Sequence, residues 1–139
     1  MTKPCILVIE DDRELHEIMR IRLEALGCQV ESAHAGNEGF LLAQRIQPSC
    51  IILDVFLPDM DGLTILKRLK APLDVETGRP SATKEIPVII VTGKAPMIEN
   101  MTRVEGASDF FLKPIDIEKL TERVTQLLEQ GQHERDRRR

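Results

Sequence analysis

The chain has 139 residues, of which 42% are hydrophobic and 30% are charged, and its formal net charge is −4. This length and composition are typical of one globular domain with a full hydrophobic core. The acidic balance argues against direct binding to nucleic acids or membrane surfaces, and no apolar run approaches the roughly 18 residues of a membrane span. Cysteines and histidines are scattered without ligand spacing, so we expect core thiols in a reducing cytoplasm and imidazoles with surface or packing roles. They are Cys5, Cys28, Cys50, His16, His34 and His133.

The first half of the chain predicts strands and helices in alternation. Residues 5–9 and 50–54 are short apolar runs, which is typical of strands buried on both faces of a parallel sheet. A shorter strand is expected at 29–32. Between these strands, apolar residues at helical spacing predict two helices, the first ending at Gly27 and the second before Pro48. Their expected buried residues are Leu15, Ile18, Met19, Leu23 and Leu26 in the first helix, and Phe40, Leu41, Ala43 and Ile46 in the second.

The second half continues the alternation. It predicts helices at 63–69, at 97–105 and from Asp116 onward, and strands at 87–91 and 109–112. Residues 71–85 hold two prolines, a glycine and several polar side chains, so we expect a long, mobile loop that the fold does not need. Residues 131–139 have no apolar side chain. We expect a charged tail or the start of a linker there, after a domain of residues 1–130.

Repeats of strand and helix predict an α/β fold, because the helix after each strand returns the chain to begin a parallel neighbour. Right-handed crossovers leave few possible topologies. We expect a flavodoxin-like (βα)5 doubly wound parallel sheet with strand order 2-1-3-4-5. In this order the first and third strands are neighbours, so the residues that follow them face each other.

Polar side chains lie where the predicted strands end. They are Glu10, Asp11 and Asp12 after the first strand, Asp54 at the end of the third, Thr92 after the fourth and Lys113 after the fifth. Each could alone be a helix cap, a turn residue or a surface charge. However, the carboxyl ends of parallel strands meet at one edge of the sheet, where ligands bind. Facing carboxylates repel unless a cation lies between them or one of them takes up a proton, and Mg²⁺ is the cation that suits such a site. With a lysine and a hydroxyl opposite, the set can hold a phosphoryl group.

Four stretches together resemble the receiver domain of bacterial response regulators. Residues 6–12 read Ile-Leu-Val-Ile-Glu-Asp-Asp, residues 51–62 read Ile-Ile-Leu-Asp-Val-Phe-Leu-Pro-Asp-Met-Asp-Gly, residues 88–93 read Val-Ile-Ile-Val-Thr-Gly, and residues 110–114 read Phe-Phe-Leu-Lys-Pro. The resemblance extends over residues 4–129. It implies a two-component or phosphorelay system in which Asp54 accepts a phosphoryl group from a histidine kinase or a histidine phosphotransfer protein. The signal would pass to a downstream output protein or to a missing C-terminal output domain.

The resemblance also implies roles for particular residues. Mg²⁺ would be held by Glu10, Asp11, Asp54 and the backbone carbonyl of Phe56. Thr92 would hydrogen-bond the phosphoryl group and move toward it, and Lys113 would pair with it. The peptide bond before Pro114 would be cis, and Phe110 occupies the switch-aromatic position. The domain would be a signalling module that catalyses its own phosphorylation and dephosphorylation, not an enzyme with other substrates.

Some residues depart from the family pattern. Phe56 is bulky and apolar beside the water that would hydrolyse an acyl phosphate, and Gly93 stands where alanine is usual. Phe110 has no hydroxyl, so we expect it to favour the inward position even without phosphate and to preset part of a partner surface. The apolar part of that surface is expected at Met97, Ile98, Met101 and Val104.

Three alternatives remain. A metal-dependent phosphatase with an aspartyl nucleophile usually has a second acid two residues later, where this chain has Phe56. A receiver-like binding module that is not phosphorylated would leave the full set of phosphorylation residues unexplained. A flavin-binding protein of the same fold is disfavoured, because the acidic edge would repel a flavin phosphate.

Overall fold

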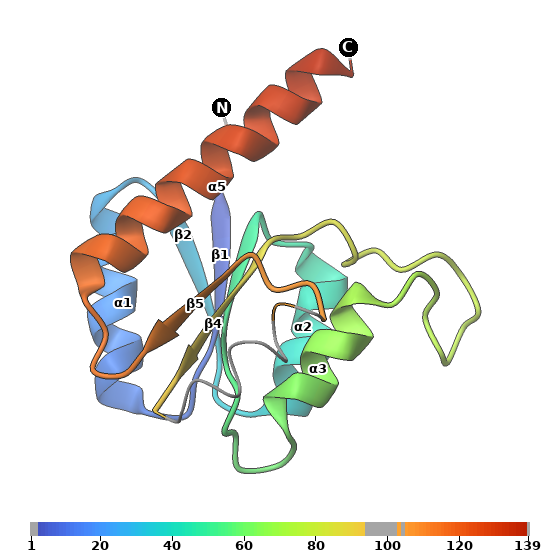
Figure 1. Ribbon diagram of the computed structural model, residues 1–139, viewed down its shortest axis with the longest axis horizontal. Helices are drawn as coiled ribbons and strands as arrows, with labels where there is room; N and C mark the ends of the chain where they lie inside the picture. Colours follow the sequence, from blue (N-terminus) through green and yellow to red (C-terminus); the bar gives the residue numbers. More distant parts are fainter. Residues whose placement is uncertain (1–2, 94–102, 104, 139) are drawn as a thin grey trace.

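The computed structural model describes residues 3–93, 103 and 105–138 (Figure 1). Its elements are β1 (Cys5–Ile9), α1 (Arg13–Ala25), β2 (Gln29–Ala33), α2 (Gly36–Ile46), β3 (Cys50–Asp54), α3 (Gly62–Lys70), β4 (Val88–Thr92), β5 (Asp109–Leu112) and α5 (Ile117–Arg137). The helix expected at 97–105 falls almost wholly outside the described residues, and so do the four apolar residues named for its partner surface, Met97, Ile98, Met101 and Val104.

The five strands form one parallel sheet in the order β2-β1-β3-β4-β5, which confirms the predicted flavodoxin-like topology. Every residue of β3 and β4 is buried, as the apolar runs indicate for central strands. The register pairs Ile9 of β1 with Leu53 of β3. The residues that follow these two strands are therefore brought to the same place at the carboxyl edge.

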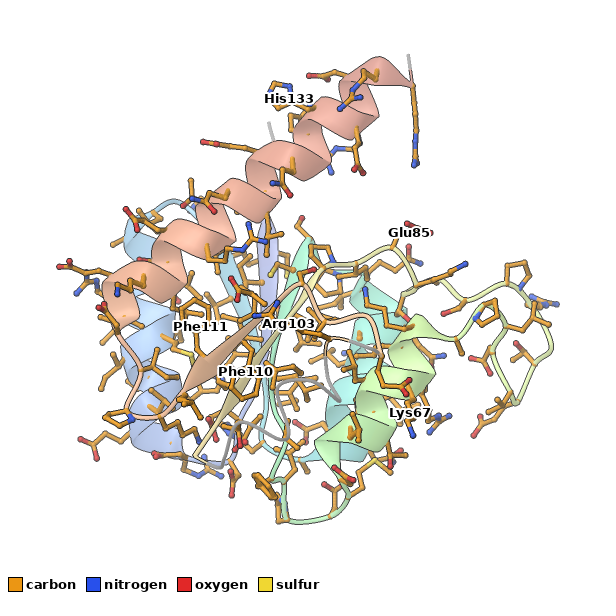
Figure 2. All side chains as sticks on the ribbon, in the orientation of Figure 1. Lys67, Glu85, Arg103, Phe110, Phe111 and His133 are labelled. Atoms are coloured by element: carbon orange, nitrogen blue, oxygen red, sulfur yellow. The ribbon has the colours of Figure 1, made fainter. Side chains whose placement is uncertain are left out.

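Helices cover both faces of the sheet (Figure 1). α2 and α3 pack on one face, and α1 and α5 pack on the other. Because side chains alternate along a strand, neighbouring residues of β5 contribute to different cores. Phe110 packs against the core under α2 and α3, and Phe111 packs against the core under α1 and α5 (Figure 2).

Three of the apolar helix residues expected in the core are exposed. On α1 the buried residues are His16, Met19 and Leu23, whereas Ile18 and Leu26 are 44% and 55% exposed. On α2 Leu41 is 53% exposed, beside the buried Phe40. The helices pack on a sheet through a stripe only about 100° wide, so apolar residues at the edges of that stripe remain in solvent.

The segment between α3 and β4 is more ordered than a loose loop. Its first part is a small hairpin in which Leu73 bridges Pro80. Thr83 in its second part is buried, and its hydroxyl donates a hydrogen bond to the Leu69 carbonyl at 2.8 Å. Lys70 donates to the carbonyl of Lys84 at 3.1 Å. The expectation of a loose segment over residues 71–85 is therefore wrong for residues 81–85, which are held against the end of α3.

The last helix is longer than the sequence pattern indicates. α5 begins after its N-cap Asp116, as predicted, but it continues to Arg137. Residues 132–138 are exposed, and this end of α5 extends beyond the sheet (Figure 1). The expected tail is thus largely helical, and the division of the chain at residue 130 stays a prediction. None of the helices in the described residues combines the length and apolar character needed to cross a membrane.

Candidate functional site

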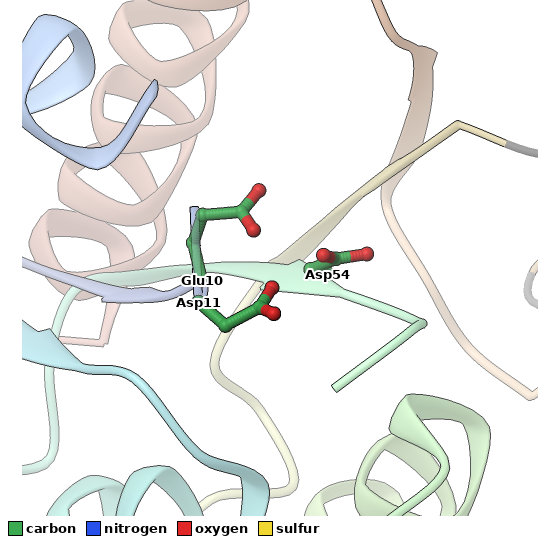
Figure 3. Close-up of side chains that lie close together, drawn as sticks. All are labelled: Glu10, Asp11 and Asp54. Carbon is green, nitrogen blue, oxygen red and sulfur yellow. The ribbon is translucent and has the colours of Figure 1, made fainter. Parts of the chain in front are cut away.

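Three carboxylates meet at the carboxyl edge of the sheet. Glu10 and Asp11 follow β1, and Asp54 ends β3. One oxygen from each lies within 4.8 Å of the others, and Figure 3 shows the three side chains close together. Glu10 and Asp54 are buried, whereas Asp11 is exposed. The predicted acidic cluster therefore exists, with one of its members reachable from solvent.

Lys113 lies against this cluster from the end of β5. Its Nζ is 2.8 Å from Glu10 Oε1 and 3.3 Å from Asp54 Oδ2. Burial raises the pKa of Glu10, Lys113 opposes this shift, and Asp54 adds to it, so that the pKa of Glu10 is about 7. Burial also disfavours the Lys113 ammonium, but its contacts with Glu10 and Asp54 outweigh this and raise the pKa of Lys113. The lysine is therefore a fixed positive charge beside both acids.

The turn after β3 is tightly built. The Phe56 N–H donates to Asp54 Oδ1 at 3.0 Å, and Phe56 bridges Asp61 across the turn. Asp61 then caps α3 by accepting from the Leu63 N–H at 2.9 Å. Gly62 is required here, because a Cβ atom would lie 2.5 Å from the backbone oxygen of Asp54. The turn holds Asp54 in place and leaves the Phe56 ring 43% exposed beside it.

Thr92 and Phe110 lie where the sequence predicts, on neighbouring strands. Thr92 ends β4 and is fully buried, and its carbonyl accepts a hydrogen bond from the Lys113 N–H at 2.7 Å. Phe110 is partly buried, with its ring packed against the core on the α2 and α3 face. The Lys113–Pro114 peptide bond is cis, as expected. Strands β4 and β5 therefore bring a hydroxyl and a lysine to the acidic edge.

Three further side chains support the site without belonging to the residues expected to contact the metal or the phosphoryl group. Asp12 accepts hydrogen bonds from Glu14 N–H and Leu15 N–H and caps α1, which is the simple structural role open to it. Asp59 accepts from the first two N–H groups of α2, those of Gly36 at 2.6 Å and Asn37 at 3.0 Å. His34 contacts the backbone of Glu10. The turn-rich stretch before Gly62 points to a capping role for Asp59, but no sequence signal marks His34.

The described residues therefore form a doubly wound fold with three carboxylates and a lysine at one edge of the sheet. A model of the response regulator receiver domain matches residues 6–125. The chain is 36% identical over 126 residues to the DNA-binding dual master transcriptional regulator RpaA of Synechocystis sp., with 90% of this chain and 49% of RpaA covered. It is 31% identical to the transcriptional regulatory protein TrcR of Mycobacterium tuberculosis, with 92% of this chain and 46% of TrcR covered.

Solved structures give the same result. The Francisella response regulator 1452 receiver domain superposes with a TM-score of 0.80 at 25% identity, covering 93% of this chain and 99% of that one. A response regulator receiver domain protein from Methanospirillum hungatei also gives a TM-score of 0.80 at 25% identity, covering 96% of this chain and 99% of that one. The chain belongs to the response regulator receiver domain family of two-component signalling. It spans about half the length of the curated relatives it matches.

Proposed function

We propose that this receiver domain takes a phosphoryl group from a phosphohistidine onto Asp54 in a Mg²⁺-dependent step, and that the modification switches partner binding. The observation that carries the proposal is the contact of Lys113 with both Asp54 and Glu10, beside the exposed carboxylate of Asp11. An acceptor carboxylate, a metal-binding acid and a fixed cation are the parts that phosphoryl transfer needs.

The residues present fit a hard divalent cation. The family generally binds Mg²⁺ at an acidic pocket, and the acidic cluster here supplies oxygen ligands of the preferred kind. Glu10 Oε1 is buried and pairs with Lys113 Nζ at 2.8 Å, whereas Asp11 is the exposed member of the cluster. We assign Glu10, Asp11, Asp54 and the backbone carbonyl of Phe56 to the metal, which would neutralise charge on the phosphoryl oxygens when bound.

In the transfer, an Asp54 oxygen attacks phosphorus, the new O–P bond forms, and the P–N bond to the donor imidazole breaks with its electron pair left on nitrogen. Lys113 is within reach of the oxygens of the group on Asp54 and would pair with them. The Thr92 hydroxyl would donate a hydrogen bond from the neighbouring strand. These contacts lower the energy of the transition state by positioning and charge, so the domain would catalyse its own phosphorylation and dephosphorylation.

The conformational change would begin with a movement of Thr92 toward the phosphoryl group, and Phe110 would then move inward. The partial burial of Phe110 against the core supports an inward preference that exists before phosphorylation. Receiver domains interact with histidine kinases and output domains. We propose a histidine kinase or a histidine phosphotransfer protein as donor, and an output protein or output domain as receiver of the signal, in the cytoplasm. Direct binding to nucleic acid or membrane is not part of the proposal.

The aspartyl phosphatase has no support from the site. The position two residues after Asp54 carries Phe56, which has no group that could transfer a proton to a leaving alcohol. The receiver domain family and the complete set of acidic residues, hydroxyl and lysine favour the signalling function.

Incubation with a small acyl-phosphate donor and intact-mass measurement tests the proposal. One phosphoryl group should be added in the presence of Mg²⁺, and none with a chelator or in Asp54→Asn. Lys113→Ala should still bind Mg²⁺ but lose the conformational change that follows phosphorylation, measured by amide hydrogen exchange. Labelling that persists in Asp54→Asn would show that another residue is the acceptor.

A further inference from the structure

Asp11 is the exposed member of the acidic cluster, and its position depends on the backbone. Among the described residues, its carboxylate makes no hydrogen bond or ion pair. Glu10, by contrast, is buried, and its Oε2 accepts a hydrogen bond from the Asp12 N–H at 3.1 Å. The orientation of Asp11 therefore follows from the peptide group that joins it to Glu10.

The peptide groups on both sides of the Glu10 Cα atom are held, the one before it by β2 and the one that joins it to Asp11 by the residue after β2. The Glu10 N–H donates to the Ala33 carbonyl at 3.0 Å, which continues the ladder between β1 and β2. The Glu10 carbonyl, which belongs to the peptide group before Asp11, lies 2.9 Å from Nδ1 of His34. Since a carbonyl oxygen can only accept, Nδ1 must be the nitrogen that carries the proton.

His34 is itself fixed on both sides. Its ring lies against the ring of the buried His16 of α1, with centroids 4.9 Å apart and planes tilted by 51°. Two residues later, the start of α2 is tied to the turn after β3 through Asp59, which accepts from Gly36 N–H and Asn37 N–H. The segment between β2 and α2 thus connects the turn that carries Asp11 to the turn that follows Asp54.

We infer that His34 is a positioning residue for the metal-binding acids: its Nδ1–H holds the Glu10–Asp11 peptide group so that Asp11 faces Asp54. The inference rests on the proposed function, because it assigns the contact to Mg²⁺ binding. His34 lies two strands away from Asp54 in the sheet order and belongs to the support of the acids, not to the set that contacts the metal. Residues that orient metal ligands typically change metal affinity by 10- to 100-fold when they are removed.

The test is Mg²⁺ affinity, measured by calorimetry without any phosphoryl donor, in wild type and three variants. His34→Leu removes the donor and should weaken binding about tenfold. In His34→Asn the amide nitrogen occupies the place of Nδ1, two bonds from Cβ, and should restore affinity to within about twofold of wild type. His34→Gln is the matched control, since its amide nitrogen takes the place of Nε2 and should not restore binding.

Thermal unfolding of the same variants separates positioning from packing. All three lose the ring contact with His16, so their melting temperatures should fall together, while only His34→Asn keeps Mg²⁺ affinity. Equal affinities in wild type and all variants, or equal weakening in all three, would overturn the role of His34 and leave the proposed function standing. A wild type that does not bind Mg²⁺ would instead contradict the proposed function, and the role of His34 with it.

Discussion

Lys113 and Lys70 lie at opposite ends of the same sheet, and their surroundings differ in kind. Lys113 follows β5 at the carboxyl edge, where it contacts the carboxylates of Glu10 and Asp54. Lys70 ends α3 near the amino edge, where it donates to the backbone carbonyls of Lys84 and Ile86. Full opposite charges raise the pKa of Lys113 despite its burial, whereas burial lowers the pKa of Lys70.

The two lysines have different kinds of partner: Lys113 contacts charged carboxylates, whereas Lys70 contacts neutral backbone carbonyls. Carbonyl dipoles can anchor the Lys70 ammonium and tie the segment before β4 to the end of α3, but they carry no full negative charge that would balance it. At the carboxyl edge, two buried acids share one lysine, so the cluster retains negative charge that a cation or a protein partner can use. The same type of side chain therefore joins two backbone segments at one end of the sheet and balances two buried acids at the other.

Lys113→Met should give the largest loss of stability. It leaves two buried carboxylates without their cation, and breaking a buried pair typically costs 3–5 kcal/mol. Because Lys113 is 25% exposed, we expect a loss of about 2–3 kcal/mol at pH 8 without metal. The loss should shrink at pH 5, below the Glu10 pKa of about 7, where Glu10 takes up a proton and no longer needs a cation. Urea unfolding at both pH values in the presence of a chelator measures it. A loss of stability of the same size at both pH values would show that Lys113 does not stabilise the fold by neutralising the buried carboxylates.

Glu10→Gln tests the acid that Lys113 contacts. The pKa of Glu10 is about 7 in the folded protein, above its usual 4.5. The folded state therefore binds the Glu10 proton more tightly than the unfolded state does. This contribution to the free energy of unfolding is fully present below pH 4.5 and is lost as the pH rises through 7. The stability of Glu10→Gln relative to wild type should improve by about 3 kcal/mol between pH 4.5 and pH 8. The exposed acid Glu122 gives the control variant, Glu122→Gln, which should show no such trend in metal-free unfolding curves.

Lys70→Met should have the smallest effect of the three. It removes hydrogen bonds to the carbonyls of Lys84 and Ile86, and we expect a loss of about 1 kcal/mol. Since these partners do not titrate, the loss should be the same at pH 5 and pH 8. Phosphorylation of Asp54 should proceed at the wild-type rate. If the loss of unfolding free energy in Lys70→Met grew with pH, as it should in Lys113→Met, then Lys70 would also be balancing a titrating acid.

The sequence predicts the sheet and the acidic cluster well, because short apolar runs followed by polar residues determine both. The strand at 50–54 and the N-cap at Asp116 are found at the predicted positions. Features that depend on contacts across the fold are not predictable in this way. The contact between His34 and Glu10 joins residues from two strands through one side-chain rotamer, and the anchoring of Thr83 depends on where α3 ends.

The end of α5 was missed for a different reason. An absence of apolar residues predicts an unpacked segment, but it does not exclude a helix. Residues 131–137 are mostly glutamine, glutamate and arginine, which have high helix propensity. They continue a helix that is already nucleated and packed at Leu120, Val124 and Leu127. Propensity, not hydrophobic periodicity, is the signal that would have extended the prediction.

Because α5 is long and extends beyond the sheet, a small rotation at its start becomes a large movement at its far end. The helix starts four residues after Lys113 and continues for 21 residues, about 30 Å at 1.5 Å per residue. Only its first half is held by the core, through Leu120, Thr121, Val124 and Leu127. A tilt of about 10° at the base would move the far end by about 5 Å over that length. A small change in the side-chain contacts at the acidic edge would thereby become a displacement that a distance measurement between two attached labels can resolve.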